Sequence, residues 1–288
     1  MKHHIAVLFH EADRPMLKYY AISALAETWR RDGHTVTNIF GIKKFIPADL
    51  ILVHVDLSVV PDEYLAFADQ YPIVLNSKAG DIRKSAFSRH LLLKQNDNYP
   101  GPVFIKSNLN FAGIPESLRQ RKYPFKGSEA GYYIGTGVER ILRSADRLFS
   151  REPSGHLLFE DLHKVPVKWF ERDDIVIQRF CPEYEKGFYH VRYYQFLGDR
   201  STCERLSSHH PIVKDSSGVK RERVDVHPEI ERLRHELNFD YGKFDYVMHE
   251  GQPVLLDINK TTGSAKKVTP AIEAMRRHRA EGIYSYFR

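Results

Sequence analysis

Apolar positions in the first part of the chain follow two alternating periods. Four segments have the pattern of strands: residues 5–9 (IAVLF), 34–40 (HTVTNIF), 48–56 (ADLILVHVD) and 72–76 (PIVLN). Between them, apolar side chains recur at helical spacing from residue 17 to residue 31, and residues 60–71 (VPDEYLAFADQY) form a second predicted helix. Strands that alternate with helices favour a small parallel sheet with flanking helices. No GxGxxG follows the first strand, which argues against dinucleotide binding there.

The pattern changes after Gly80. The spacing predicts a helix over residues 82–94, a strand over 102–106 that leads into a loop of small residues, and a strand over 173–185 that is ended by a proline. Between these two strands lies a glycine-rich segment, residues 126–137 (KGSEAGYYIGTG), which we expect to be mobile. This region therefore differs in organisation from the first part of the chain.

The last third of the chain begins with a strand of alternating pattern, residues 188–198, which ends at a turn formed by Gly198 and Asp199. The elements expected after it are a charged, solvated loop, a helix and two strands: residues 213–223, 228–238, 244–248 (FDYVM) and 254–259 (VLLDIN). The short connection HEGQP between the last two strands predicts a hairpin.

This hairpin opposes two acids. With its turn centred on Gly251, Asp245 faces Asp257 and Lys243 faces Asn259. Asp257 and Asn259 are two residues apart and share a face of their strand. Two facing carboxylates repel each other, and a cation between them removes the repulsion. Oxygen ligands favour a hard ion, Mg²⁺ or Mn²⁺, and magnesium also takes substrate phosphates as ligands, so the pattern fits a metal–nucleotide site.

Other positions supply what a nucleotide needs, namely cations for its phosphates and backbone groups beside an apolar slot for its base. The candidate residues are Lys84, Lys106, Arg192 and Gln178. Each also has a structural interpretation. Lys84 fits a solvated helix residue, and Lys106 fits the end of an edge strand. Arg192 fits an ion-pair partner, and Gln178 fits an ordinary strand residue. In the same way, the two aspartates fit surface acids paired with lysines of their own hairpin.

Composition narrows the class of protein. Hydrophobic content of 42% and charge content of 28% are typical of soluble globular chains, and no apolar run approaches the roughly 20 residues of a membrane helix. The N-terminus lacks a signal-peptide layout, and Cys181 and Cys203 lack metal-like spacing, so we expect a cytoplasmic protein without disulfides. The net charge of +6 fits an anionic ligand or nucleic acid, but no contiguous basic–aromatic stripe or RNP-like motif favours nucleic acid.

Taken together and in this order, these segments resemble the ATP-grasp superfamily over roughly residues 76–263. The stretch FDYVMHEGQPVLLDINKTTG is similar to the family's terminal pattern of an acid, a hairpin and acid-x-Asn. By this resemblance, the ligands of magnesium (or manganese) are Asp245, Asp257 and Asn259. VFIK resembles the strand whose lysine contacts the nucleotide, here Lys106. VLNSKAGDIRK resembles the helix entry whose lysine reaches the phosphates, here Lys84.

Two further segments carry the resemblance. VIQRFCPEYE resembles the family's hinge, and the residues that it would place around adenine are Gln178, Phe180 and Cys181. Glu183 or Glu185 would then bind the ribose hydroxyls. HVRYYQFLGDR resembles the strand in which an arginine, here Arg192, meets phosphate or acyl phosphate. The basic residues expected on the acceptor side are Arg192, Arg200, Lys260 and Lys266, although Lys260 also fits a structural role.

The sequence departs from the family pattern at three places. The family's glycine-rich phosphate loop closely follows the lysine strand, whereas NFAG has a single glycine here and the richer segment comes later. Which of the two covers the phosphates stays open. Gln178 stands where the hinge often has glutamate, and Thr262 replaces the proline that is common before Gly263.

The resemblance implies a fold and a reaction. The expected class is α/β, an ATP-grasp fold behind an N-terminal Rossmann-like (pre-ATP-grasp) lobe, with domains at residues 1–76, 77–180 and 181–288. The expected reaction uses ATP and Mg²⁺ to activate a small-molecule carboxylate as an acyl phosphate, which an amine or other nucleophile then attacks. Open alternatives are a small-molecule kinase of the same fold, a nucleotide-binding protein without turnover and, on charge alone, a nucleic-acid-binding module. A homodimer is compatible with each of them.

Overall fold

A computed structural model describes residues 1–120, 134–135, 137–138, 157–265 and 268–288 of the chain. Its contacts divide the chain into two compact units. The first comprises Met1–Asp56, Val60–Gly80 and Glu183–Arg288, and the second comprises Leu57–Val59 and Asp81–Pro182. The finer division into three domains stays a prediction. None of the described helices combines the length and the apolar character that crossing a membrane requires.

The N-terminal sheet in the first unit is parallel, as the sequence predicts. Its strands lie in the order β2 (Thr35–Phe40), β1 (His4–Phe9), β3 (Leu50–Val53) and β4 (Ile73–Leu75). The two helices of this region are α1 (Ala21–Arg31) and α2 (Asp62–Ala68). The helix expected from residue 17 begins later, because Glu11–Tyr19 forms a 3₁₀ helix that contains Pro15.

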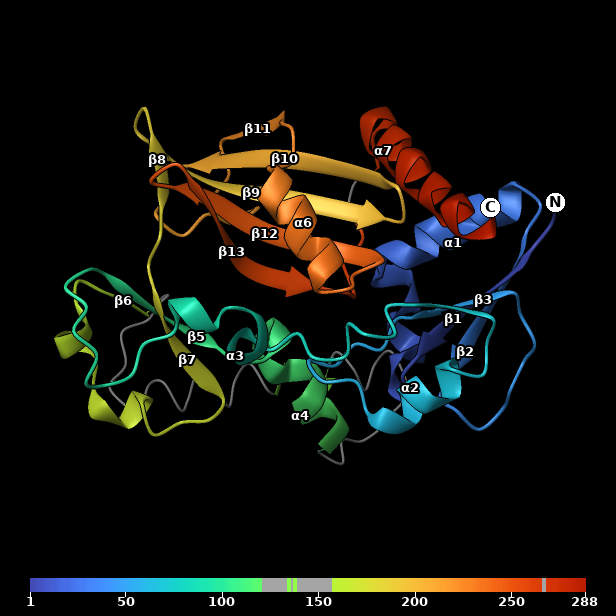
Figure 1. The fold of residues 1–288 in the computed structure, drawn as a ribbon, viewed down its shortest axis with the longest axis horizontal. Coiled ribbons are helices and arrows are strands. Elements are labelled where there is room, and N and C mark those ends of the chain that lie inside the picture. The colour runs from blue at the N-terminus through green and yellow to red at the C-terminus, as the bar shows by residue number, and fades with distance from the viewer. Residues whose placement is uncertain (121–133, 136, 139–156, 266–267) are drawn as a thin grey trace. The chain divides into compact units, whose positions relative to one another are not determined.

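One hydrophobic core joins the two ends of the chain within the first unit. Buried residues of β1 and α1, among them Phe9 and Trp29, cluster with Leu197, Tyr241 and Ile283 from the last third of the chain. The indole Nε1 of Trp29 donates a hydrogen bond to the carbonyl of Ala280 (2.8 Å) at the end of α7 (Pro270–Ala280). Helices α1 and α7 pack against each other (Figure 1). The N-terminal sheet therefore folds onto C-terminal elements.

The second sheet of the first unit is antiparallel and has six strands. The path of five strands is β11 (Lys220–Arg223), β10 (Arg200–Ser208), β9 (Phe188–Leu197), β12 (Tyr241–His249) and β13 (Gln252–Asn259), and β8 (Glu183–Glu185) also pairs with β9. Helix α6 (Pro228–Glu236) packs against β13 (Figure 1). The guanidinium of Arg234 in α6 donates to the Tyr194 hydroxyl (3.3 Å) on β9.

The second unit contains a three-stranded sheet. Its strands lie in the order β6 (Leu157–Phe159), β5 (Val103–Ser107) and β7 (Ile175–Arg179), and its helices are α3 (Lys84–Phe87) and α4 (Ile114–Gln120). On one face of this sheet, Val103, Ile105 and Ile177 pack with Trp169 in a hydrophobic cluster. Alternation along β5 and β7 therefore turns the neighbouring residues to the opposite face.

Several elements differ from the prediction. The strand expected over residues 173–185 is divided into β7 and β8, which belong to different sheets, and β10 forms where no element was predicted. The helix expected over residues 82–94 is limited to Lys84–Phe87 because the chain then joins an edge of β7, where Leu92 pairs with Gln178. In the charged stretch expected to be a loop, Lys220–Arg223 instead forms β11, because its alternating charges meet partners on β10. The glycine-rich segment 126–137 lies almost entirely outside the described residues.

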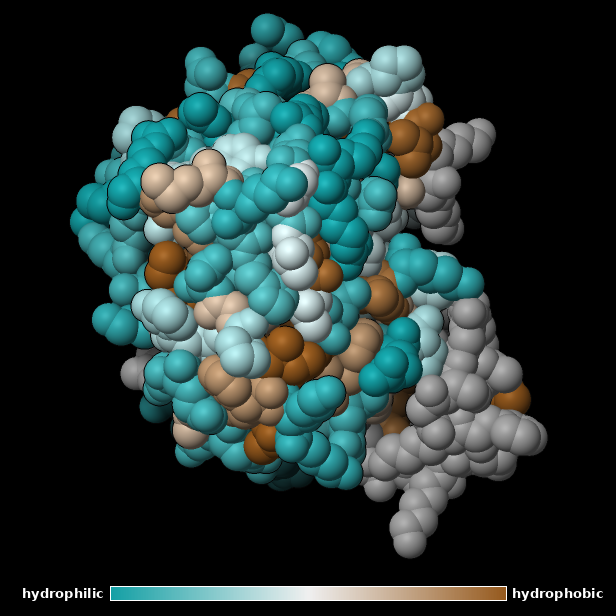
Figure 2. All heavy atoms as spheres, turned by 90° about the vertical axis from the view of Figure 1, so that its right-hand side faces the viewer, coloured by the Kyte–Doolittle hydropathy of each residue, from teal (hydrophilic) through white to brown (hydrophobic). Residues whose placement is uncertain are grey.

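Hydrophilic side chains dominate the face of the molecule that Figure 2 shows. Hydrophobic residues (brown) form small separate patches there among hydrophilic ones (teal). Scattered apolar surface of this kind is normal for a folded chain.

Candidate active site

The β12–β13 hairpin opposes two aspartates across neighbouring strands. Asp245 pairs with Asp257, and Lys243 pairs with Asn259. Partners in an antiparallel pair point to the same side of the sheet, and so do residues two apart in one strand. The four side chains therefore share one face, and this part of the predicted register is confirmed.

The turn of the hairpin is tighter than predicted, and a bulge compensates for it. The loop holds only Glu250 and Gly251, both with positive φ (50° and 79°), as a type I′ turn requires. The prediction of a turn centred on Gly251 is therefore wrong by half a residue, and the pairs near the turn are offset accordingly. A register shift between Asp245 and Tyr246 takes up the difference and restores the opposition of the aspartates.

Lys243 balances one of these acids directly. Its Nζ lies 3.0 and 3.1 Å from the two carboxylate oxygens of Asp245. Burial alone lowers the pKa of Lys243, but Asp245, assisted by Asp257, more than offsets burial and raises it. The lysine therefore stays charged between carboxylates. The sequence pattern singled out the acids and treated Lys243 only as their partner, but its position makes it a candidate functional residue.

Hydrogen bonds from the N-terminal part of the unit fix the end of β13. The backbone N–H of Thr261 donates to Oδ1 of Asn259 (2.8 Å), and its hydroxyl donates to Oδ1 of Asp56 (2.6 Å). The Tyr20 hydroxyl donates to the other oxygen of Asp56 (2.9 Å). Thr261 is buried, so its hydroxyl needs such an acceptor. Asp56 and Thr261 are thus positioning residues for Asn259, and no motif in the sequence indicated them.

Lys260 points away from the acids. Its side chain is 1% exposed, and Nζ lies 3.4 Å from the carbonyl oxygens of both Ala79 and Gly80. Successive residues of a strand alternate between faces, which separates Lys260 from Asn259 beside it. The structure therefore does not bring this predicted catalytic residue to the metal candidates, and its contacts are those of a structural lysine.

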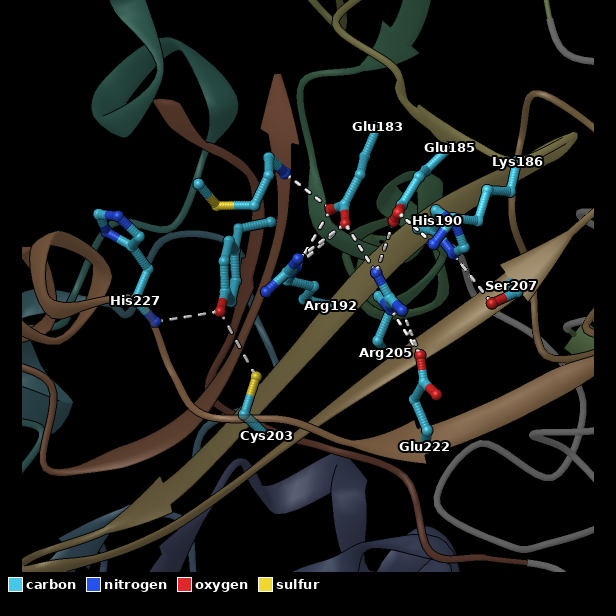
Figure 3. Close-up of polar contacts among 12 residues, drawn as sticks. Glu183, Glu185, Lys186, His190, Arg192, Cys203, Arg205, Ser207, Glu222 and His227 are labelled. Carbon is cyan, nitrogen blue, oxygen red and sulfur yellow. Dashed lines mark hydrogen bonds and ion pairs between the residues drawn. The ribbon is translucent and has the colours of Figure 1, made fainter. Parts of the chain in front are cut away.

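Arg192 belongs to an ionic network on the other face of β9 (Figure 3). Its guanidinium donates to Oε1 of Glu183 (2.8 Å), and the other Glu183 oxygen accepts from the backbone N–H of Met248 (2.8 Å). Arg205 lies 3.8 Å from Glu183 and 3.3 Å from Glu185. Burial alone lowers the pKa of Arg192, but Glu183 more than offsets it and raises the pKa.

The structure also gives the positions of the predicted ribose-binding glutamates and of the predicted acceptor-side basic residues. Glu183 is buried and engaged, whereas the Glu185 side chain is 49% exposed. Arg192 pairs across the sheet with Tyr246, the residue next to Asp245, and so faces away from that acid. Arg200 begins β10 and lies 4.0 Å from Asp199. Lys266 lies outside the described residues.

The second unit brings four predicted nucleotide residues to one region. Phe104 pairs with Gln178 across β5 and β7, and Lys106, two residues from Phe104, shares its face. Nζ of Lys106 lies 5.2 Å from the Phe104 ring centroid, and the Phe104 and Phe180 rings are 6.5 Å apart. Gln178 is 1% exposed, and within the described part of the chain its Nε2 has no hydrogen-bond partner. Cys181 follows as a half-buried cysteine that forms no disulfide with the described residues.

Lys84 is held near the end of β5. Its backbone N–H donates to the carbonyl of Asn108 (3.2 Å), and the side chain of Asn108 accepts from the N–H of Ser85 (2.9 Å). The Lys84 side chain is buried, which overturns the alternative of a solvated helix residue. The second unit thus supplies two lysines and an aromatic slot, which is the chemistry of a nucleotide site.

The shared face of the hairpin has the donor chemistry of a hard divalent cation. Asp245, Asp257 and Asn259 offer only oxygen atoms, as Mg²⁺ and Mn²⁺ prefer. Across the described ranges no group of three His, Cys, Asp or Glu side chains converges on a metal position, so the amide of Asn259 would complete the set. A cavity of about 750 Å³ opens on this face, and Lys243 and Asn259 are part of its lining.

Comparisons with known proteins bear on the fold. No protein-family model and no curated protein sequence matches the chain. The structure is similar to D-alanine–D-alanine ligase from Bacillus anthracis, with 12% identity and a TM-score of 0.52, over 100% of this chain and 96% of that one. It is also similar to the ATP-grasp ligase PsnB complexed with a phosphomimetic variant of a minimal precursor, Mg and ADP (12% identity, TM-score 0.51, 99% and 98% covered).

A third similar structure is a RimK domain ATP-grasp protein from Sphaerobacter thermophilus DSM 20745, with 13% identity and a TM-score of 0.50, over 99% of this chain and 98% of that one. In each case the similarity extends over nearly the whole of both chains. At such low identity it concerns the fold and leaves the reaction open. The chain has the ATP-grasp fold, as its sequence predicts.

Proposed function

We propose that the protein is an ATP- and Mg²⁺-dependent ligase that activates a carboxylate as an acyl phosphate and joins it to an amine or other nucleophile. The observation that carries this proposal is the opposition of Asp245 and Asp257, with Asn259 and Lys243 beside them, on a sheet face next to a cavity. The ATP-grasp fold supports the proposal because two of the similar structures are named as ligases.

The hairpin residues would have distinct roles. Asp245, Asp257 and Asn259 would hold Mg²⁺ or Mn²⁺, which would offset negative charge on the transferring phosphoryl group. Lys243 would donate a hydrogen bond to an oxygen of the acyl phosphate, a role that the resemblance to the ATP-grasp superfamily implied for Arg192. Asp56 and Thr261 would keep the Asn259 amide oriented through their hydrogen bonds.

The proposed reaction has two steps. An oxygen of the substrate carboxylate attacks the γ-phosphorus, the bond from that phosphorus to the bridging oxygen breaks, and ADP leaves. The nucleophile, an amine in the simplest case, then attacks the acyl carbon, phosphate leaves with the bonding electrons, and the nitrogen loses a proton. The protein mainly positions the reactants and offsets charge, so no nucleophilic side chain is required.

The second unit would bind the nucleotide. Lys84 and Lys106 would contact phosphates, and the residues around adenine would be Gln178, Phe180 and Cys181. Of the two glutamates, Glu185 is the better candidate for the ribose hydroxyls, because Glu183 already accepts hydrogen bonds from Arg192 and Met248. Cys181 and Cys203 form no disulfide in the part of the chain that the structure describes. The reaction would take place in the cytoplasm, as the sequence predicts.

The test replaces Asp257 by asparagine and measures Mg²⁺-dependent ATP turnover. The assay presents pooled carboxylates and amines and follows phosphate release, with mass spectrometry of the products. We expect Asp257→Asn to reduce turnover by about 100-fold or more, because the neutral amide removes one charge from the proposed metal site. Circular dichroism should show an unchanged fold.

Asp69→Asn is the matched control, since Asp69 is an exposed residue that ends α2. It should keep full turnover. Equal activity of Asp257→Asn and the wild-type protein would refute the metal assignment. Transfer of labelled γ-phosphate to a stable product, without any need for an amine, would identify a kinase instead of a ligase.

A further inference from the structure

The cavity on the hairpin face has a second, unexplained set of basic residues. Its floor includes Lys243 and Asn259, and one of its walls is helix α7, which contributes Arg276 and Arg279. With a volume of about 750 Å³ it has more room than a single small acid needs. The function of the α7 arginines is therefore not covered by the proposed phosphoryl chemistry at the hairpin.

The other cations of the cavity are balanced by acids of the same unit. Arg221 forms ion pairs with Glu204 (3.1 Å) and with Asp215, and Lys243 is paired with Asp245. These pairs lie within the lining or directly next to it. The charge of Arg221 is therefore already offset by two acids, and Lys243 is assigned to the reacting acyl phosphate by the proposed ligase function.

The α7 arginines lack such acids. Arg276 donates to the hydroxyl of Ser264 (2.9 Å), and Arg279 donates to Oε1 of Gln195, so both contacts are with neutral groups. Arg279 is only 8% exposed, and its Nε has no hydrogen-bond partner in the part of the chain that the structure describes. Within the same described residues, neither guanidinium takes part in an ion pair. Burial lowers the pKa of Arg279, and Arg276 lowers it further, whereas Tyr241 and Glu204, which lies beyond ion-pair distance, offset only part of this effect.

A buried guanidinium without a counterion, such as that of Arg279, is unfavourable, and the half-buried Arg276 three residues earlier on the same helix repels it. An anion between them would remove both costs. Two guanidinium groups provide the planar, forked donors that match a carboxylate. The geometry therefore indicates a preorganised anion-binding position at Arg276 and Arg279, where α7 lines the cavity.

We propose that Arg276 and Arg279 bind a carboxylate of the substrate other than the one that is activated, so that the substrate is an acid with at least two carboxylates. The role as a substrate anchor rests on the proposed ligase function. Arg279 contacts Gln195, and Gln195 pairs with Lys243 on the adjacent strand. Gln195 thus links the α7 arginines to Lys243, and all four residues line the same cavity.

The experiment measures binding without any nucleotide. Calorimetric titrations at constant ionic strength use glutarate, which has two carboxylates, and butyrate, which has one. We expect saturable glutarate binding to the wild-type protein, at least about 10-fold tighter than that of butyrate. Arg276→Gln and Arg279→Gln should each weaken glutarate binding by about 10-fold or more, and Arg276→Lys should retain part of the affinity because it keeps the charge.

Arg277→Gln is the control on the same helix, because Arg277 pairs with Asp32 (2.5 Å) and does not line the cavity. It should leave glutarate binding unchanged. Arg276 is only half-buried, so its variants keep the test decisive even if loss of Arg279 disturbs folding. The Nε resonance of Arg279 in ¹⁵N-labelled protein should also shift during the titration.

Equal affinities for glutarate and butyrate, or an Arg276→Gln variant that binds glutarate like the wild type, would overturn the proposal. Tighter binding of inorganic phosphate than of glutarate would overturn it as well and assign the arginines to phosphate. Because nucleotide is absent, these results do not depend on Asp257. Failure of the ligase proposal in the turnover assay is therefore separate from failure of the anion site.

Discussion

At the scale of single residues, His54 shows how strongly burial controls chemistry in this fold. The imidazole is fully buried at the end of β3, among the rings of Phe9, Tyr20 and Tyr241, at centroid distances of 5.0, 4.9 and 6.0 Å. Burial, with a smaller contribution from the charge of Lys260, lowers the pKa of His54 to about 3. The side chain is therefore neutral at neutral pH in the folded protein.

This shift predicts a pH dependence of stability. Below about pH 6.5 the unfolded chain takes up a proton on His54, whereas the folded chain does not until about pH 3. The contribution of neutral His54 is thus fully present above pH 6.5 and falls by about 1.4 kcal/mol per pH unit below it. Urea unfolding of His54→Phe from pH 7 to pH 4 should show the loss of this slope relative to the wild type.

His163→Phe is the control, because His163 is an exposed histidine. It should show the same pH dependence as the wild type. If His54→Phe and the wild type lose stability in parallel as the pH falls, the imidazole is protonated in the folded state, and the assignment of a low pKa is wrong.

At the scale of elements, the β12–β13 hairpin decides which side chains face each other. Its two-residue turn places Glu250 in the left-handed region (φ 50°), which costs a non-glycine residue free energy. Asparagine followed by glycine is the preferred sequence of a type I′ turn. Glu250→Asn should therefore raise the free energy of unfolding by about 0.5–1 kcal/mol, measured by urea denaturation.

The neighbouring residue offers a control for this substitution. Gln252 is equally exposed but begins β13, so Gln252→Asn should be neutral or slightly destabilising. ATP turnover should be unchanged in Glu250→Asn, because the bulge between the Asp245–Asp257 and Tyr246–Leu255 pairs keeps the two aspartates opposite each other. A loss of stability on Glu250→Asn would contradict the turn type.

At the scale of the whole molecule, Asn76 ties the N-terminal sheet to the C-terminal sheet within the first unit. Its side-chain Nδ2 donates to the carbonyl of Tyr241 (2.9 Å), and Oδ1 accepts from the N–H groups of Asp240 and Tyr241 (3.0 and 3.1 Å). Asn76 is buried and has a φ of 60°, a conformation that asparagine tolerates better than most residues. Asn76 thus adopts the positive φ of its turn and also makes the hydrogen bonds that join the two sheets.

Removing this side chain should destabilise both sheets together. We expect Asn76→Ala to lower the free energy of unfolding by about 3 kcal/mol, because buried backbone groups lose their partners and alanine is strained at positive φ. Asn76→Gly removes the strain alone and should recover about 1 kcal/mol of this loss. Hydrogen exchange should speed up in β1 and β12 alike. Faster exchange confined to β4 would contradict a shared core.

Much of the fold follows from local pattern. Local pattern gave the four strands of the parallel sheet and β9, β12 and β13 of the antiparallel sheet, but not β10. The predicted hairpin gave the opposition of Asp245 and Asp257, although a bulge is needed to produce it. The pattern failed where distant partners decide the structure. Residues 220–223 form a strand because β10 supplies opposite charges, and the helix after Arg83 stops because the chain joins β7.

The sequence by itself determined which side chains share a face within an element, because the period of a helix or strand is a local property. Only the tertiary structure decided that Arg192 is bound by Glu183, that Lys260 is buried, and that α7 brings two arginines to the hairpin cavity. These placements join residues far apart in the chain. They depend on which surfaces are buried together, and that is settled by the packing of the whole unit and not by local spacing.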